Sequence, residues 1–175
     1  MIAPQKPPKL PPRHSVRTLA ERLFMTFDCQ NQKQCLRWAL AAVLSLEKHG
    51  IHACINAGTA NFQANDMPEP HPTHVGYFWQ DEDDDTIQRY LQLGILPEMH
   101  CWAVVPSLNM IVDPTTQFLP HIAAEKRIPW TKPYPPEWFW GMSPPTGWCY
   151  TPHERACLLA ADLAMQVVKG QSHLC

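Results

Sequence analysis

The segment CLRWALAAVLSLEKHG, residues 35–50, constrains the fold more than any other part of the chain. It is almost wholly apolar and rich in good helix formers, and it ends at Gly50, a residue that commonly stops a helix. A helix that is apolar around most of its surface has to be covered by other elements. The sequence therefore predicts a central buried helix, with Cys35 in its first turn.

Two strand-like runs, MHCWAVV and NMIVDPTTQF, are separated only by the segment PSL, which predicts an antiparallel hairpin. If the turn lies within PSL, Val105 pairs with Met110, and Trp102 then pairs with Asp113. Side chains alternate between the two faces of a strand, so His100 shares a face with Trp102. His100 and Asp113 become diagonal neighbours, close enough for a hydrogen bond.

The remaining segments predict an α+β protein with the cysteine helix packed on an antiparallel β-sheet. An amphipathic helix should begin at a Ser15 cap and end near Asp28, and a final helix should cover 152–169. Strands are expected at 51–62 and 73–80, with a short helix after the acidic run at 81–85.

Prolines divide the rest of the chain. Residues 1–14 form a proline-rich arm, and residues 15–175 form a single domain. Residues 128–150 hold so many prolines and tryptophans that we expect a long aromatic loop without regular elements. Its rings either wall a cleft or close the core, and the sequence leaves both options open.

Composition excludes several classes of protein. The 175 residues are 45% hydrophobic and 17% charged, as in an ordinary globular domain. The net charge of −2, without a basic stripe, argues against nucleic acid as a partner. The longest apolar stretch, 38–46, is too short to cross a membrane, and prolines interrupt the N-terminal region where a signal peptide would need an apolar core. A cytoplasmic location is expected.

The cysteines agree with that location. There are seven, at positions 29, 35, 54, 101, 149, 157 and 175, an odd number with irregular spacing. Such a set fits free thiols in a reducing compartment better than a disulfide framework.

Cys35 is the strongest candidate for a nucleophile. A cysteine reacts as its thiolate, and both a helix N-terminus and a neighbouring imidazole lower its pKa. Cys35 has the first of these advantages by position. His100 would supply the second, with Asp113 fixing the tautomer of the imidazole and stabilising its charged form.

The order of these residues resembles a known family. A cysteine that opens a buried helix, a strand with His-x-Trp (His100, Trp102) and a strand that ends in Asp-Pro-Thr (113–115) are similar to the core of transglutaminase-like proteins, which are related to arylamine N-acetyltransferases and distantly to papain. The resemblance spans roughly residues 30–120. It implies a papain-like or transglutaminase-like core and a catalytic triad of Cys35, His100 and Asp113.

Two departures from the family pattern matter. The acetyltransferase motif Arg-Gly-Gly-x-Cys is absent, since residues 32–34 read QKQ, so no coenzyme A and no other cofactor is expected. Papain-like enzymes carry a glutamine six residues before the cysteine, where this chain has Cys29. Gln30 becomes the candidate side-chain donor to an oxyanion, together with the backbone N–H of Cys35.

The resemblance implies acyl transfer through a thioester at Cys35, with a peptide or another amide as the substrate. Hydrolysis is the first expectation, because no second-substrate site is visible; transfer to an amine, as in transglutaminases, is the alternative. Four tryptophans are candidate substrate contacts: Trp38, Trp102, Trp138 and Trp140.

Two other interpretations stay open. His71 and His74 with Cys54, or His100 with Cys101, offer metal ligands, but their spacing matches no standard zinc motif, so no metal is predicted. Alternatively, the chain is a non-catalytic module that binds a peptide with its Trp/Pro-rich surface. Reactivity of Cys35 at low pH distinguishes an enzyme from such a module.

Overall fold

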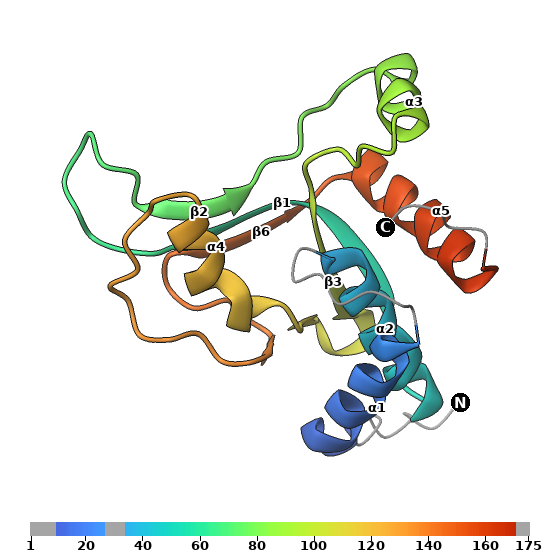
Figure 1. Cartoon of the computed structure of the whole chain (residues 1–175). Coiled ribbons are helices and arrows are strands. Elements are labelled where there is room, and N and C mark those ends of the chain that lie inside the picture. The colour runs from blue at the N-terminus through green and yellow to red at the C-terminus, as the bar shows by residue number, and fades with distance from the viewer. Residues whose placement is uncertain (1–9, 27–33, 171–175) are drawn as a thin grey trace, which may run out of the picture.

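The computed structural model describes residues 10–26 and 34–170 (Figure 1). The helices are α1 (Arg13–Met25), α2 (Cys35–Lys48), α3 (Asp84–Gln92), α4 (Leu119–Glu125) and α5 (Glu154–Val168). The strands are β1 (Cys54–Gln63), β2 (His74–Tyr77), β3 (His100–Val105), β4 (Met110–Asp113), β5 (Phe139–Gly141) and β6 (Trp148–Pro152). The predicted α+β class with an antiparallel sheet is confirmed.

The strands form one six-stranded sheet in the order β2-β1-β3-β4-β5, with β6 also paired to β1. All its pairs are antiparallel. Gly58 stands where β1 passes from one partner to another, because it pairs with His100 of β3 and with Pro152 of β6. Its φ is 155°, and an added Cβ would lie 2.3 Å from the carbonyl oxygen of Thr151. Only glycine fits this crossing.

The β3–β4 hairpin has the predicted register. Val105 pairs with Met110 and Ala103 with Val112. A 3₁₀ turn at Pro106–Leu108 makes the connection, and Asn109 closes it in the left-handed conformation with φ 47°. This register carries His100 and Asp113 onto the same face of the sheet, as the alternation of side chains requires.

Helix α2 is the buried helix that the sequence predicts. Residues 36–42 are all buried, and the helix ends at Lys48, two residues before the predicted stop at Gly50, which has φ 73°. The N–H groups of Gly50 and Ile51 donate to the carbonyls of Glu47 and Leu46, which satisfies two of the last carbonyl groups of the helix.

Helices cover both faces of the sheet. Figure 1 shows α1 and α2 packed together at one end and α4 lying over β2. Side chains of α1 and α2 form a core with the inner positions of β3 and β4, including Ala103, Val105 and Val112. Helix α4 covers Phe62 and Val75 on the other half of the sheet, and α5 packs against β1.

Several boundaries differ from the sequence predictions, and two of the differences are explained by local structure. Helix α1 begins at Arg13, two residues before the predicted Ser15 cap. The N–H of Ser15 donates to the carbonyl of Pro12, the residue that precedes the helix. The strand predicted to continue through PTTQF ends at Asp113, where a 3₁₀ turn and α4 follow. Pro120 lies in the first turn of α4, a position that tolerates proline.

The expectation of a wholly irregular segment at 128–150 is wrong. It contains β5 and the start of β6. Strand β5 has only three residues and lies at the edge of the sheet, where flanking prolines cost no ladder hydrogen bonds. Strand β5 is too short to stand out in a sequence pattern, and the prolines and glycines before β6 hide its start.

The predicted short helix after the acidic run is α3. Asp83 caps it, since its side chain accepts hydrogen bonds from the N–H and the hydroxyl of Thr86, each at 2.9 Å. Within the described ranges, none of the helices has the length and apolar character that a membrane crossing demands.

Candidate active site

The centre of the candidate site is a hydrogen bond between His100, at the start of β3, and Asp113, at the end of β4. Nε2 of His100 lies 2.7 Å from Oδ2 of Asp113. The two residues are 1% and 0% exposed. A buried pair of this kind holds the imidazole in one orientation and leaves Nδ1 as its other proton-exchanging nitrogen.

Every oxygen of the Asp113 carboxylate is occupied by donors. Oδ1 accepts hydrogen bonds from the backbone N–H of Thr115 at 2.9 Å and from its hydroxyl at 2.6 Å. Oδ2 accepts from the hydroxyl of Tyr150 at 2.8 Å in addition to His100. With so many donors around it, the carboxylate is held as the charged form.

The pKa values follow from these contacts. Burial alone would raise the pKa of Asp113, but the charge and hydrogen bond of His100 and the donors of Thr115 outweigh burial and lower it. Burial likewise opposes charge on His100, and the charge and hydrogen bond of Asp113 raise the pKa of the imidazole to about 10. The pair is therefore a carboxylate and an imidazolium near neutral pH.

Cys35 is the first residue of α2, and its thiol lies beside the start of β3, where it interacts with His100. Its Sγ lies 3.8 Å from the carbonyl oxygen of Met99. A hydrogen bond with the Cys101 thiol is the largest influence on the pKa of Cys35 and lowers it; burial opposes this, and the His100 ring lowers it further. The pKa of Cys101 is raised, chiefly by the same hydrogen bond, so Cys35 is the thiol of the two that ionises.

Nδ1 is the ring nitrogen of His100 that does not bind Asp113. It is buried and makes no close hydrogen bond within the described part of the chain. The ring nevertheless interacts electrostatically with the thiol of Cys35, and this interaction favours charge on both groups. Since Nε2 is committed to Asp113, Nδ1 is the nitrogen that remains for proton exchange with the sulfur or a substrate.

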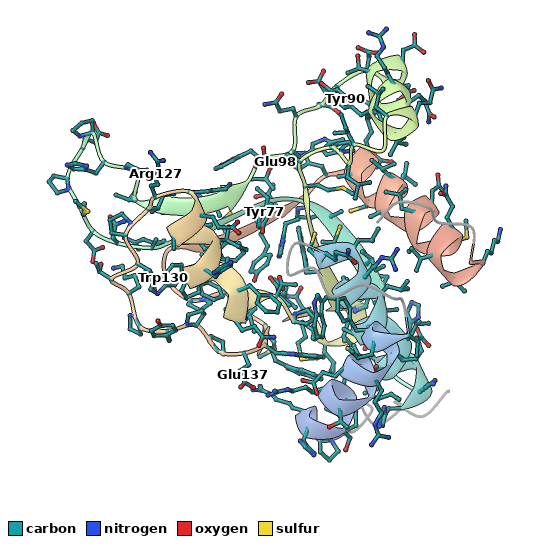
Figure 2. The ribbon with its side chains drawn as sticks, viewed as in Figure 1. Tyr77, Tyr90, Glu98, Arg127, Trp130 and Glu137 are labelled. Atoms are coloured by element: carbon teal, nitrogen blue, oxygen red, sulfur yellow. The ribbon has the colours of Figure 1, made fainter. Side chains whose placement is uncertain are left out.

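Aromatic rings enclose the imidazole. Tyr77 stacks on His100 with centroids 5.0 Å apart and planes 21° apart, and Trp102 stacks on it at 5.9 Å and 24°. Figure 2 shows Tyr77 beside Glu98, which precedes β3. Burial, followed by the nearby negative charges, raises the pKa of Tyr77, so its phenol stays neutral.

The four candidate tryptophans do not share one location. Trp102 lies beside His100, but Trp38, Trp138 and Trp140 belong to the core formed with α1. Trp38 stacks on Phe24 at 4.1 Å, and Trp138 meets Trp38 edge-on at 6.4 Å. These three rings thus lie in the core under α1 and not beside His100, a position that large apolar rings readily take, and their contact with a substrate stays a prediction. Gln30 lies outside the described residues.

The metal alternative gains no support from the geometry. Across residues 10–26 and 34–170, no three side chains of His, Cys, Asp or Glu gather closely enough to hold an ion, which includes the grouping of His71, His74 and Cys54. The five cysteines of these ranges are all free.

Two pockets lie away from the site, beside α1. One, of about 320 Å³, is lined by Arg13, Arg17 and Trp138, among others. The other, of about 440 Å³, is lined by Leu10, Arg13 and Met142, among others, and both include Trp140. Of the four candidate tryptophans, Trp138 and Trp140 thus border pockets beside α1.

Three residues of the site escaped sequence reasoning: Tyr77, Cys101 as a partner of Cys35, and Tyr150. Tyr150 sits in β6, within a segment expected to be irregular, and nothing in its local pattern marks it. Tyr77 lies in a strand that was predicted, but the pairing of β1 with both β2 and β3, which aligns Tyr77 with His100, is a long-range feature.

Comparisons of the chain with protein-family models, with curated proteins and with solved structures found no match, so the site rests on its own geometry.

Proposed function

We propose that the chain is a thiol-dependent acyl-transfer enzyme that hydrolyses an amide or peptide bond through a thioester on Cys35. One observation carries the proposal: the buried hydrogen bond of 2.7 Å between His100 and Asp113, next to a thiol whose pKa is lowered. Perturbed titratable groups that act on one another are typical of catalytic sites.

The first step forms the thioester. The Cys35 thiolate attacks the carbonyl carbon of the amide, and the His100 imidazolium gives its proton to the leaving nitrogen as the C–N bond breaks. The amine departs, the acyl group stays on sulfur, and His100 is left neutral. Asp113 stays charged throughout and orients the ring, because its oxygens are already filled by other donors.

The second step releases the acyl group. Neutral His100 takes a proton from water, the oxygen attacks the thioester carbonyl, and the C–S bond breaks to restore the thiolate and the imidazolium. The product is a carboxylic acid. An amine in place of water would give a new amide. Hydrolysis and transfer thus differ only in whether water or an amine attacks the thioester.

The negative oxygen that forms in each step needs donors. The N–H of Cys35 lies at the start of α2, where N–H groups have no carbonyl of their own helix to bind. A backbone donor at this position, with the positive end of the helix behind it, suits an oxyanion. Gln30 remains the candidate for a second, side-chain donor.

The likeness to transglutaminase-like and papain-like enzymes supports the same proposal. A cysteine at the start of a buried helix, a histidine and an aspartate on neighbouring antiparallel strands, and the chain order Cys35, His100, Asp113 agree with that core. An active-site cysteine of this class requires no cofactor, and a reducing location such as the cytoplasm keeps it a thiol.

The test is the pH dependence of alkylation, followed residue by residue with mass spectrometry. At about pH 6, iodoacetamide should label Cys35 well ahead of Cys149, an exposed thiol of the same chain, because reactivity follows the thiolate fraction. Labelling by electrophilic amide and ester probes should follow the same preference. If Cys35 reacts at low pH no faster than Cys149, the proposal fails.

The pockets beside α1 support a second candidate function, that of a non-catalytic module that binds peptides. They combine tryptophan surface with charged residues, Arg13, Arg17 and Glu137, as a peptide groove would. For such a module, Cys35 should be unreactive. Proline-rich peptides should bind saturably, and Trp140→Ala should abolish that binding.

A further inference from the structure

Strand β6 brings a fourth polar side chain to the triad. It pairs with β1 so that Tyr150 lies opposite Ala60, two positions from Gly58, the partner of His100. The hydroxyl of Tyr150 donates to Oδ2 of Asp113 at 2.8 Å, the same oxygen that binds Nε2 of His100. The phenol and the imidazole therefore share one acceptor atom.

The direction of this hydrogen bond is set by its surroundings. Asp113 is a carboxylate, so both of its oxygens can only accept hydrogen bonds. Oδ1 accepts both hydrogen bonds from Thr115. Burial, with the charge of Asp113, raises the pKa of Tyr150 well above its usual value, so the phenol keeps its proton. Tyr150 is a permanent donor to the carboxylate over the whole range in which His100 titrates.

The ring of Tyr150 is fixed as firmly as its hydroxyl. It packs against Trp102 at 5.1 Å, Phe62 at 5.5 Å and Phe139 at 6.1 Å. These contacts come from three different strands and survive replacement of tyrosine by phenylalanine. The hydroxyl can thus be removed without removing the ring that holds it in place.

We propose that Tyr150 is a positioning residue of the catalytic site, which withdraws charge from Asp113 and so keeps His100 acidic enough to donate its proton. This inference rests on the proposed function. An imidazolium paired with a bare carboxylate is a reluctant acid, because the pair favours the charged form of both partners. A second donor on Oδ2 weakens that pairing and aids release of the proton to the leaving amine.

The sign of the effect follows directly. Loss of the Tyr150 hydroxyl leaves more negative charge facing His100, so the pKa of the imidazole rises. In Tyr150→Phe, acylation of Cys35 by an amide probe should slow about tenfold, and the basic limb of its pH profile should move up by about half a pH unit to one unit. A hydroxyl with only a structural role would lower the melting temperature without moving that limb.

The decisive measurement is the titration of His100 by nuclear magnetic resonance in the Cys35→Ser background, with Tyr134→Phe as the control. Tyr134 is 84% exposed, so loss of its hydroxyl should leave the titration in place. Tyr150→Phe should raise the pKa of His100, and 3-fluorotyrosine at position 150, a stronger donor of nearly the same shape, should lower it. The fluorinated protein also tests the inference if Tyr150→Phe does not fold.

The outcomes separate the two levels of the argument. The role of Tyr150 is overturned if Tyr150→Phe and 3-fluorotyrosine leave the pKa of His100 unchanged, or move it in the opposite direction, even if Cys35 is reactive. An unreactive Cys35 with the expected shifts of His100 overturns the proposed enzyme while the effect of Tyr150 on the pair stands. Since the titration needs no substrate, neither failure hides the other.

Discussion

Two aromatic clusters lie on this sheet, one around His100 and one under α1. The aromatic cluster around His100 comprises Phe62, Tyr77, Trp102 and Tyr150. The tryptophan cluster under α1 comprises Phe24, Trp38, Trp138 and Trp140. Both are built from stacked and edge-on rings at similar spacings, so the density of aromatic residues does not tell a site from a core.

The difference lies in what the rings enclose. The cluster around His100 surrounds an imidazole and a carboxylate, whose hydrogen-bond partners come from strands β3 and β6 and from the turn after β4. The tryptophan cluster under α1 surrounds apolar side chains such as Val16 and Ala42. Burying charge is costly unless it is paired and hydrogen-bonded, so the buried pair of His100 and Asp113 is a stronger sign of function than abundant tryptophan.

The largest expected effect is the loss of activity when Cys35, the thiol beside His100, is replaced. Cys35→Ser should reduce turnover of an amide substrate or capture of an amide probe by about 10⁴-fold or more, because a serine hydroxyl is not ionised by this imidazole. Cys149→Ser is the matched control and should leave capture unchanged. Intact-mass analysis after exposure to the probe measures both, and probe that stays bound to Cys35→Ser would contradict the assignment.

The next effect distinguishes the dyad from an ordinary polar contact. Asp113→Ala leaves His100 buried without its charged partner and should lower the free energy of unfolding by about 3 kcal/mol. Low-pH alkylation of Cys35 should fall by about 10²-fold, since the imidazole loses the charge that stabilises the thiolate. Chemical denaturation and alkylation kinetics check the two results. Asp81→Ala, which removes an exposed carboxylate paired with Arg155, should change neither.

A comparable loss of stability should occur in the other cluster without any loss of reactivity. Trp138→Ala opens a cavity under α1 and should cost about 3 kcal/mol, or roughly 10 °C in melting temperature. Alkylation of Cys35 at low pH should stay as in the unmodified chain. A normal melting temperature together with lost probe capture would instead place Trp138 against the substrate, and the contrast between the clusters would collapse.

The pH dependence of stability tests the dyad from the titration side. The pKa of His100 is raised to about 10, so its stabilising effect is complete below the unfolded pKa of about 6.5 and is lost as pH rises through 10. In the Cys35→Ser background, the free energy of unfolding should fall by a few kcal/mol between about pH 7 and pH 10. Adding His100→Gln should flatten this dependence; an equally steep decline would mean that other groups cause it.

The smallest effect belongs to the edge of the tryptophan cluster. Arg13 donates to the carbonyl of Trp140 at 3.0 Å, and its guanidinium lies 5.7 Å from that ring. Arg13→Ala should lower the melting temperature by about 2 °C, as expected for roughly 0.5–1 kcal/mol from an exposed cation that contacts a tryptophan ring. Arg13→Lys should recover part of the loss, and neither change should alter the reactivity of Cys35.

Sequence patterns predict the local parts of this molecule well. The burial of α2, its end just before Gly50 and the register of the β3–β4 hairpin all depend on residues close together in the chain, and each is observed. The hairpin alone was enough to predict the contact between His100 and Asp113. Those features follow from helix propensity, turn length and side-chain alternation.

The missed parts depend on distant pairing. Tyr150 and Asp113 are separated along the chain by α4, a proline-rich segment and β5, and no periodicity links them. For Trp138 and Trp140 the sequence leaves a cleft wall and a core position both open; Trp140 in β5 and Trp138 just before it lie in the core under α1. A three-residue edge strand carries too little pattern to reveal which way its side chains point.

Strand β1 also determines where this chain can tolerate change. Along its ten residues it aligns β2, β3 and β6, and thereby Tyr77, His100 and Tyr150. An extra residue in a connecting loop, such as 66–72 or 142–146, would leave those alignments intact. An extra residue within β1 would shift one set of partners against another and send side chains to the wrong face. Loop length is thus free to vary around this site, and the length of β1 is not.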